Sequence, residues 1–408
     1  MRQNLTPDEA LELLLTHAEP ITELETVPLE AALGRVLGAD LASQVDHPDC
    51  DNTAVDGYAA RAADTQGATR ERPVRLRLIG EAPAGRPFPA RVGPGEAVAV
   101  YTGAPLPEGA DAVVRVEETA RDGDTVLLFA PASPKDIRPR AEDLEQGQVY
   151  LRKGEVLSPG KVGLAAAMGY PRLPVVRRPR VGLLVTGDEV VEPGEALPYG
   201  GVYNANRYSV GALVREAGGE VVYLGKAGDD REALKARLAA AGPLDLLLTS
   251  GGVSMGAYDL VRRLLEEEGR VHFWRVSIRP GGPLLFGEWR GVPLLGLPGN
   301  PVSSMVTFFL FGRPFLFRLL GRVDAPYRRV RAVAETPFKD AGARTAFWRG
   351  VLEYAPEAPG GFRVRSVGNQ SSGVLRSMSE ANALVVVPPG RRVGVGEVVE
   401  AIVLRPEL

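Results

Sequence analysis

Two glycine-rich loops, each between an apolar run and a helical pattern, are the segments of this chain best suited to bind a ligand. The run Leu244–Leu248 leads into the first loop, and the second occupies 297–304. Backbone N–H groups at a helix start, together with the helix dipole, favour anions. The pattern therefore predicts a phosphorylated or oxyanionic ligand, although neither loop matches a P-loop or a dinucleotide-binding fingerprint. The candidate ligand-binding residues of the two loops are Ser250, Gly251, Gly252, Ser254, Pro298, Gly299, Asn300 and Pro301.

Three acidic residues follow predicted strands of the same region: Glu189, Asp229 and Asp259. Taken singly, Asp229 could be a helix cap and Asp259 a solvated acid of a first helical turn. Together they would face the crevice at the carboxyl ends of the strands, where α/β sheets bind ligands. Acids alone would repel an anion, so they predict Mg²⁺ between protein and ligand more than they predict a general base. Because Mg²⁺ takes one or two carboxylates, not all three need bind it.

Two loops in the N-terminal half also concentrate polar groups and turn residues. Asp51–Tyr58 crowds polar side chains around a glycine, and Tyr101–Asp111 is a long Pro/Gly-rich loop after an apolar strand. From their composition alone both could be stiff turns, since proline and glycine preset the backbone. The single cysteine, Cys50, has no strong activating cation beside it in sequence, and the three histidines argue against a histidine-rich metal site.

Composition excludes several classes of protein. The 408 residues carry a formal net charge of −3 with 45% hydrophobic and 24% charged residues, which argues against general nucleic-acid or membrane-surface binding. One cysteine rules out an internal disulfide and fits a reducing, cytoplasmic compartment. The start of the chain shows no secretory signal. The apolar stretch Val302–Leu320 is interrupted by Arg313-Pro314, which favours a kinked buried helix over a membrane span.

The order of helix-type and strand-type patterns along the chain predicts a multidomain protein of α/β plus β class. Thr6-Pro7-Asp8-Glu9 predicts a helix start, short β-type runs follow, and from Pro179 strands alternate with helices as in a doubly wound parallel sheet. We expect a helix and an elongated linker domain in 1–45 and 139–178, and a β-rich domain in 46–138. The α/β domain should span 179–325, and a small C-terminal β-barrel 326–408.

Six motifs in order give the chain a resemblance to a known family. They are Asn52–Ala59, Tyr101–Val114, Thr186–Glu189, Tyr203–Arg207, Thr249–Ser254 and Leu297–Ser303. Together they resemble the molybdopterin molybdotransferase family (MoeA), which includes the E domain of gephyrin and plant homologues. The resemblance runs nearly from end to end.

The resemblance implies a function that the crevice alone does not specify. Family members take adenylylated molybdopterin and molybdate, insert molybdenum at the dithiolene and release AMP with the help of Mg²⁺. They are elongated homodimers with a MogA-like α/β domain, and a molybdopterin adenylyltransferase is a possible partner. Carried over, the pattern gives catalytic roles to Asp56 and Thr102, which would reach the site across the dimer interface. It gives catalytic and metal-binding roles to Glu189, Asp229 and Asp259. Residues 298–301 would shape the pocket for the pterin and the oxyanion.

One stretch departs from the family pattern. Many members have Lys-Pro-Gly-Lys-Pro where this chain has Arg279-Pro280-Gly281-Gly282-Pro283. Arg279 is the candidate contact for molybdate or phosphate, because arginine can hold an oxyanion. The second cation is missing at Gly282, so either the anion site is weaker or another arginine supplies the charge.

Two other functions remain open from the sequence. A molybdopterin adenylyltransferase would need little beyond the α/β region, so the flanking β domains argue against it. A non-catalytic scaffold that only binds the cofactor would not require the acids Asp56, Glu189, Asp229 and Asp259. Tungstate and molybdate have the same charge and nearly the same size, so the sequence does not separate them.

Overall fold

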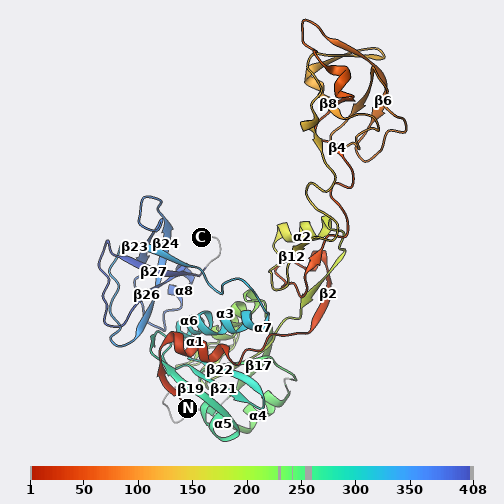
Figure 1. The fold of residues 1–408 in the computed structure, drawn as a ribbon. Coiled ribbons are helices and arrows are strands. Elements are labelled where there is room, and N and C mark those ends of the chain that lie inside the picture. The colour runs from red at the N-terminus through yellow and green to blue at the C-terminus, as the bar shows by residue number, and fades with distance from the viewer. Residues whose placement is uncertain (1, 228–230, 241, 253–259, 405–408) are drawn as a thin grey trace.

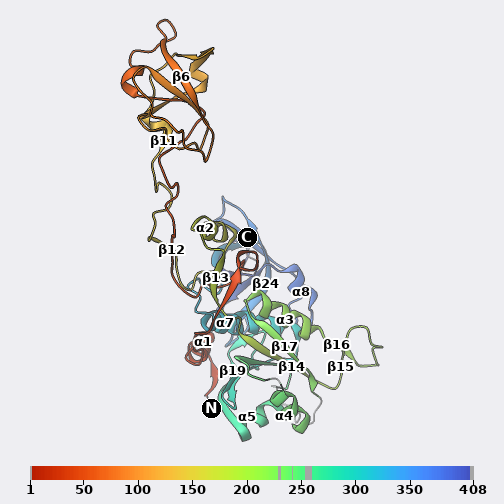
Figure 2. The ribbon, with the colours of Figure 1, turned by 90° about the vertical axis from the view of Figure 1, so that its right-hand side faces the viewer.

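The computed structural model describes residues 2–227, 231–240, 242–252 and 260–404. An α/β domain and a C-terminal β-barrel lie side by side, and a narrow arm connects them to a distal β domain (Figures 1 and 2). The molecule is therefore elongated, with the distal domain held away from the other two.

The α/β domain is built on a seven-stranded sheet. Its order is β1 (Arg2–Leu5), β19 (Gly269–Val276), β21 (Leu285–Trp289), β22 (Val292–Leu297), β18 (Leu246–Ser250), β14 (Arg180–Thr186) and β17 (Glu220–Ala227). The last four strands are parallel to one another. This confirms the parallel sheet that the alternation of strands and helices predicted.

Helices cover both faces of this sheet. On one face, α1 (Pro7–Leu15), α3 (Ala205–Glu216) and the long helix after residue 300 share a core with the side chains of Leu183 and Leu248. On the other face, α4 (Arg231–Ala240) and α5 (Leu260–Glu268) pack against Leu184 and Leu247. Neighbouring residues of one strand thus point to opposite, equally buried faces, as a doubly wound sheet requires.

Two strands of the sheet were not expected from the sequence. β21 runs antiparallel to both of its neighbours, so the sheet is mixed rather than wholly parallel on that side. It returns directly after the turn at 281–283, which leaves no room for the helix that a parallel connection needs. β1 is a short polar segment that becomes a strand only by pairing with β19, with each paired residue 271 positions away in sequence.

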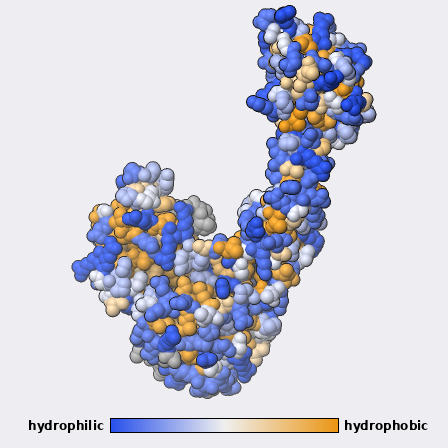
Figure 3. Space-filling view, in the orientation of Figure 1, coloured by the Kyte–Doolittle hydropathy of each residue, from blue (hydrophilic) through white to orange (hydrophobic). Residues whose placement is uncertain are grey.

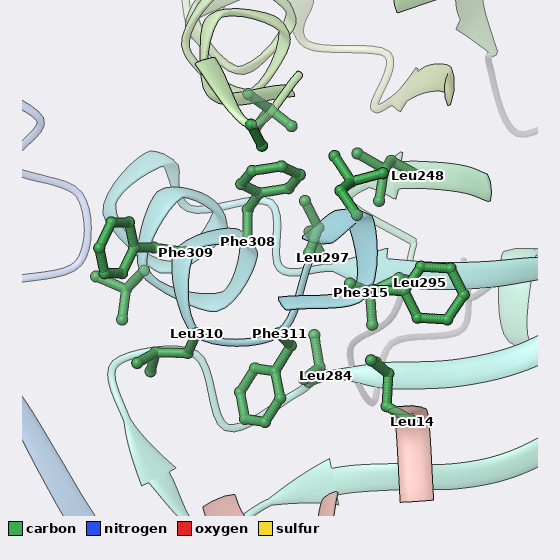
Figure 4. Packing of buried hydrophobic residues seen from close by; sticks show 14 of the residues in the cluster. Leu14, Leu248, Leu284, Leu295, Leu297, Phe308, Phe309, Leu310, Phe311 and Phe315 are labelled. Atoms are coloured by element: carbon green, nitrogen blue, oxygen red, sulfur yellow. The ribbon is translucent and has the colours of Figure 1, made fainter. Parts of the chain in front are cut away.

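The long apolar helix is buried, as its composition predicted. It comprises α6 (Pro301–Thr307), a π-helical segment Phe308–Gly312 and α7 (Arg313–Leu319). By length and composition Pro301–Leu319 could cross a membrane, but 83% of the window that meets this test is buried inside the protein. Phe308, Phe311 and Phe315 point into the core (Figure 4). The π-helical turn just before Pro314 lets the helix continue where the missing N–H would interrupt an α-helix.

The arm and the distal domain consist of antiparallel and mixed β structure. The arm contains the ladders β2 (Leu24–Pro28) with β13 (Arg172–Val176) and β3 (Leu41–Ala42) with β12 (Val149–Leu151), and the helix α2 (Pro159–Ala167). β4 (Asn52–Thr53) pairs with β11 (Ile137–Arg138) where the distal domain begins. The distal sheet has the order β8 (Ala112–Arg115), β5 (Gly57–Ala60), β7 (Glu96–Val100), β6 (Val74–Ala82), β10 (Thr125–Leu128) and β9 (Thr119–Asp122).

The C-terminal barrel is joined to the α/β domain by a short strand that follows β19 and pairs with the barrel. Its strands are β23 (Arg329–Ala334), β24 (Thr345–Tyr354), β25 (Phe362–Ser366), β26 (Ala383–Val387) and β27 (Val398–Val403), and pairing of β24 with β26 closes it. β20 (Ile278–Arg279), which leaves the α/β sheet, pairs in parallel with β24. This pairing places Arg279 beside the barrel.

Candidate active site

A cavity of about 1670 Å³ lies at the carboxyl ends of the parallel strands, between the α/β domain and the barrel. Nine of the predicted site residues line it: Glu189, Ser250, Gly251, Gly252, Arg279, Pro298, Gly299, Asn300 and Pro301. Asp229, Ser254 and Asp259 lie outside the described residues. A different, open recess separates the barrel from the arm above the α/β domain (Figure 3), and no described residue of the arm lines the cavity.

The first glycine loop needs its glycines for conformation and for space. Gly251 and Gly252 have φ angles of +91° and +68°, in the region that side chains disfavour. A Cβ at Gly251 would lie 2.6 Å from Oγ1 of Thr186. The Thr186 hydroxyl donates a hydrogen bond to the carbonyl of Ser250 at 3.3 Å. Thr186, the last residue of β14, therefore fixes the loop that follows β18.

Asn206 ties the two glycine loops together. Its Nδ2 donates hydrogen bonds to Oγ of Ser250 and to the carbonyl of Gly299, each at 2.7 Å. Asn206 lies in the first turn of α3, whose N-cap Asn204 accepts from the backbone N–H of Arg207. Sequence reasoning found the Tyr203–Arg207 motif but gave Asn206 no role. The sequence held one indication, a second asparagine two residues after the helix cap Asn204.

A segment of the barrel makes hydrogen bonds to the second glycine loop. Asn300 is the N-cap of α6, but its side chain donates to Oγ of Ser372 at 3.1 Å instead of capping the helix. The backbone N–H of Val302 donates to the carbonyl of Ser372 at 3.3 Å. The backbone N–H of Val302 is therefore not available to a ligand. Its donor is used to hold the barrel segment in place.

The barrel supplies the positive charge that the Gly282 departure removes. Arg344 and Lys339 line the same cavity as Arg279. Pairing of β20 with β24 brings them together, because Arg279 is opposite Ala346 in the ladder. The Arg279 guanidinium lies over the ring of Trp348, 5.4 Å from its centroid. Of the two alternatives left open by the sequence, this placement supports a second arginine.

Glu189 is an exposed carboxylate at the cavity, next to the exposed Asp188. Its carboxylate folds back over Gly187, where an added Cβ would meet Oε1 at 2.7 Å. One or two carboxylates beside an anion pocket fit the requirements of Mg²⁺, which completes its shell with water and phosphate oxygens. Within the described residues no group of three or more potential metal-binding side chains gathers. The full set predicted for the metal cannot be assembled from the described residues, because two of its members lie outside them.

Glu192 anchors the segment 187–192, which contains Glu189 and forms one wall of the cavity. Its carboxylate accepts hydrogen bonds from Asn204 at 2.8 Å, Arg207 at 2.9 Å and Tyr223 at 2.9 Å. Burial raises the pKa of Glu192, but these three donors outweigh it and the pKa is lowered. The pKa of the Tyr223 phenol is raised to about 12, mainly by burial and then by its bond to Glu192. The wall and the N-terminus of α3 are thus one hydrogen-bonded unit.

Asp56 and Thr102 come together in the distal domain. The backbone N–H and the hydroxyl of Thr102 donate to Oδ1 of Asp56 at 2.7 Å and 2.8 Å. These two bonds lower the pKa of the Asp56 carboxyl. Both residues are exposed, and neither lines the cavity described above. The arm holds their domain away from the α/β domain of the same chain (Figure 1).

Three family models together match almost the whole chain. The MoeA N-terminal region (domain I and II) matches residues 5–169, a probable molybdopterin binding domain matches 182–318, and the MoeA C-terminal region (domain IV) matches 331–404. The chain belongs to the MoeA family. Molybdopterin molybdenumtransferase of Haemophilus influenzae is 36% identical over 402 residues, which cover 97% of each chain.

Further MoeA relatives agree in sequence and in fold. Molybdopterin molybdenumtransferase 2 of Mycobacterium tuberculosis is 40% identical over 372 residues, covering 89% of this chain and 90% of the relative. The crystal structure of the molybdopterin biosynthesis moeA protein from Pyrococcus horikoshii OT3 is similar with a TM-score of 0.85 at 32% identity. It covers 98% of this chain and 100% of that one. The predicted fold class is confirmed.

Proposed function

We propose that this protein inserts molybdenum from molybdate into adenylylated molybdopterin and releases AMP in an Mg²⁺-dependent step. Family membership supports the broader statement, that the protein is a molybdopterin molybdenumtransferase of molybdenum cofactor biosynthesis. The finer statement rests on one observation: a single cavity joins two glycine loops, three cations and the carboxylates of Asp188, Glu189 and Asp340.

The cavity has separate features for each part of such a substrate. The N–H groups of the loops after β18 and β22 suit phosphate oxygens. Arg279, Arg344 and Lys339 suit an oxyanion such as molybdate. A volume of about 1670 Å³ leaves room for a pterin and a nucleotide together.

For the metal we propose Glu189, with Asp229 and Asp259 as further candidates. A bound Mg²⁺ would neutralise the phosphate charge next to these acids. The protein's own groups then orient the ligand: the loop N–H donors hold the phosphates, and Arg279 and Arg344 hold the oxyanion. If water attacks the adenylyl phosphorus, the bridging P–O bond breaks, the pterin phosphate is the leaving group and AMP is the product; if an oxygen of molybdate attacks the pterin phosphorus, AMP itself is the leaving group. The two dithiolene thiols then bind molybdenum, and one molybdate oxygen leaves with their two protons as water.

We also propose that the site is completed by a second copy of the chain. The distal domain carries the Asp56–Thr102 pair on its surface, far along the arm from its own cavity. A two-fold dimer could bring this pair to the partner's cavity, since each copy would offer both halves. A cytoplasmic location and contact with an adenylyltransferase stay predictions.

The deciding experiment measures AMP release from adenylylated molybdopterin, with and without molybdate and Mg²⁺. Release that requires both ions, with molybdenum recovered on the pterin, supports the proposal. Tight pterin binding without AMP release would indicate a scaffold instead. Formation of the adenylylated pterin from ATP would indicate an adenylyltransferase.

A further inference from the structure

The arm and the distal domain are joined to the α/β domain at two places along the chain. Residues 16–23 lead from α1 into β2, and residues 177–179 lead from β13 into β14. A unit held by two chain segments alone would swing about them, because domains move relative to one another unless noncovalent contacts fix them. The contacts at the root of the arm therefore decide where the distal domain lies.

Arg177 connects both of these segments to the α/β sheet. Its Nη1 and Nη2 donate to the two carboxylate oxygens of Asp245 at 2.7 Å and 3.0 Å, and its Nε donates to the carboxylate of Glu23. Glu23 belongs to the first segment and Arg177 to the second, whereas Asp245 directly precedes β18. The Asp245 carboxylate also accepts from the backbone N–H of Arg180 at 2.6 Å, which holds it beside the start of β14.

The pair of Arg177 with Asp245 is suited to fix a direction. A planar guanidinium that binds both oxygens of one carboxylate restricts the relative orientation of the two groups as well as their distance. Arg177 and Asp245 expose 30% and 19% of their side chains, so water and salt screen this pair less than an open surface pair.

A second contact, made to a different element, opposes rotation about the first. Val36 and Val176 of the arm pack against Leu320, which directly follows α7. The backbone N–H of Ile21 donates to the carbonyl of Leu319 at 2.7 Å. In both views the arm leaves the α/β domain beside α7 (Figures 1 and 2). Attachments at β18 and at α7 together define one orientation of the arm, which a single attachment would leave open.

We propose that Arg177 is a positioning residue that sets the direction of the arm and thereby the place of the Asp56–Thr102 pair. It acts at the edge of the sheet opposite the cavity, because Asp245 precedes β18 and the first glycine loop follows it. Loss of the guanidinium should therefore redirect the distal domain and leave the cavity of the same chain intact. The effect on catalysis rests on the proposed function, in which a partner's cavity needs this pair, whereas the effect on the arm does not.

The test uses four variants of the root of the arm. Arg177→Met removes the guanidinium, and Arg177→Lys keeps the charge but has no fork to span both oxygens. Asp245→Asn breaks the pair from the other side and serves if Arg177→Met does not fold. Arg172→Met is the matched control, because Arg172 lies on the same strand and donates to the carbonyl of Thr26 inside the arm. Thermal unfolding is recorded for each variant.

Arm direction, ligand binding and turnover are measured separately. Spin labels at Glu145→Cys in the arm and Arg263→Cys on α5, both exposed positions, report the distance between arm and α/β domain in a Cys50→Ala background. Labelled chains are mixed with an excess of unlabelled chains, so that each measured pair of labels belongs to one chain. Calorimetry gives the affinity for AMP, and AMP release from adenylylated molybdopterin gives kcat.

We expect Arg177→Met and Asp245→Asn to broaden the distances between the labels. Their kcat should fall about tenfold or more, because small misplacement of a group by a change far from the chemistry has effects of this size. Their affinity for AMP should equal that of the wild type. Arg177→Lys should lie between, and Arg172→Met should match the wild type in all three measurements.

Unchanged distances in a folded Arg177→Met overturn the inference, and so do broadened distances with the kcat of the wild type. A fall in AMP affinity as large as the fall in kcat also overturns it, since damage to the cavity would then explain both. If the wild type releases no AMP, the proposed function is wrong, and the distances alone decide whether Arg177 sets the direction of the arm.

Discussion

Single carboxylates and their immediate donors define the chemistry at the residue scale. Glu189 is exposed to the cavity and available to a cation, whereas Asp56 is already held by two donors from Thr102. The same residue type therefore has different tasks at the two places. Two substitutions separate them.

Glu189→Gln removes one negative charge at the cavity without changing the size of the side chain. AMP release should fall roughly a hundredfold or more, the scale of losing one group that stabilises developing charge. The measurement is the rate at several Mg²⁺ concentrations. Glu195→Gln is the matched control, because Glu195 belongs to the same segment but does not line the cavity. Equal rates for both variants would remove Glu189 from the site.

Thr102→Val removes the hydroxyl that donates to Asp56 and keeps the backbone N–H. The pKa of the Asp56 carboxyl, which these two bonds hold below 3.8, should rise toward that value. A pH titration of the carboxyl carbon by NMR measures the shift. Thr119→Val, at a hydroxyl of the same domain that donates to Val116, should leave it unchanged. No change in Thr102→Val would mean that the backbone bond alone sets this pKa.

At the scale of elements, the site depends on how segments are fastened to one another. Glu192 fastens the wall of the cavity to α3, Asn206 fastens the two glycine loops, and β20 fastens the barrel to the α/β domain. These contacts affect ligand binding without being made to the ligand, because they position other groups. Each contact fixes the position of a segment that lines the cavity.

Glu192→Gln should loosen the cavity wall in a pH-dependent way. The folded-state pKa of Glu192 lies below its usual 4.5, so its stabilising effect is present above about pH 4.5 and is lost as pH falls through the folded-state value. The variant should therefore have a lower Tm than the wild type at neutral pH, and the difference should shrink in acid. Thermal unfolding at several pH values measures this, with Glu195→Gln as the control. A pH-independent difference would contradict it.

Gly282→Lys should be tolerated and should replace a missing cation. An added Cβ there would lie 3.4 Å from the carbonyl oxygen of Ile278, which is an ordinary contact. We expect Arg344→Ala to weaken molybdate binding about tenfold, and Gly282→Lys in that background to restore much of it. Calorimetric titration with molybdate compares the three proteins. Full affinity in Arg344→Ala alone would show that the barrel arginine is not used.

The whole molecule separates its functional parts. The cavity lies between the α/β domain and the barrel, whereas the Asp56–Thr102 pair belongs to the distal domain. A narrow arm connects these two parts of the molecule (Figure 2). An elongated shape of this kind makes sense if two chains share their sites. The proposal can be tested with two inactive variants.

Asp56→Asn and Glu189→Gln should each be nearly inactive, and mixing them should restore activity. If each site takes Asp56 from one chain and Glu189 from the other, a mixed dimer has one intact site. Random exchange of subunits then returns about a quarter of the wild-type rate. AMP release after unfolding and refolding the mixture measures it. No recovery, in a mixture shown to contain mixed dimers, would place both residues in a site within one chain.

Much of the fold could be predicted because its information is local. The capping box at Thr6 and Glu9, the alternation of strands and helices after Pro179, and the apolar helix after Pro301 all rest on contacts between near neighbours in sequence. β1 and β21 could not be predicted in this way. A polar four-residue segment becomes a strand only because β19 offers it an edge, and the direction of β21 follows from a tight turn.

By itself, the sequence determined the kinds of groups at the site: glycines where the backbone must reach positive φ, a carboxylate after β14, and the Arg279 cation. Only the tertiary structure decided which groups meet. It joined Arg344 and Lys339 of the barrel to the α/β cavity, tied both glycine loops to Asn206, and left Asp56 at the far end of the arm. The reason is physical. Residue type sets charge and backbone freedom, whereas proximity between distant segments depends on how separately folded domains pack.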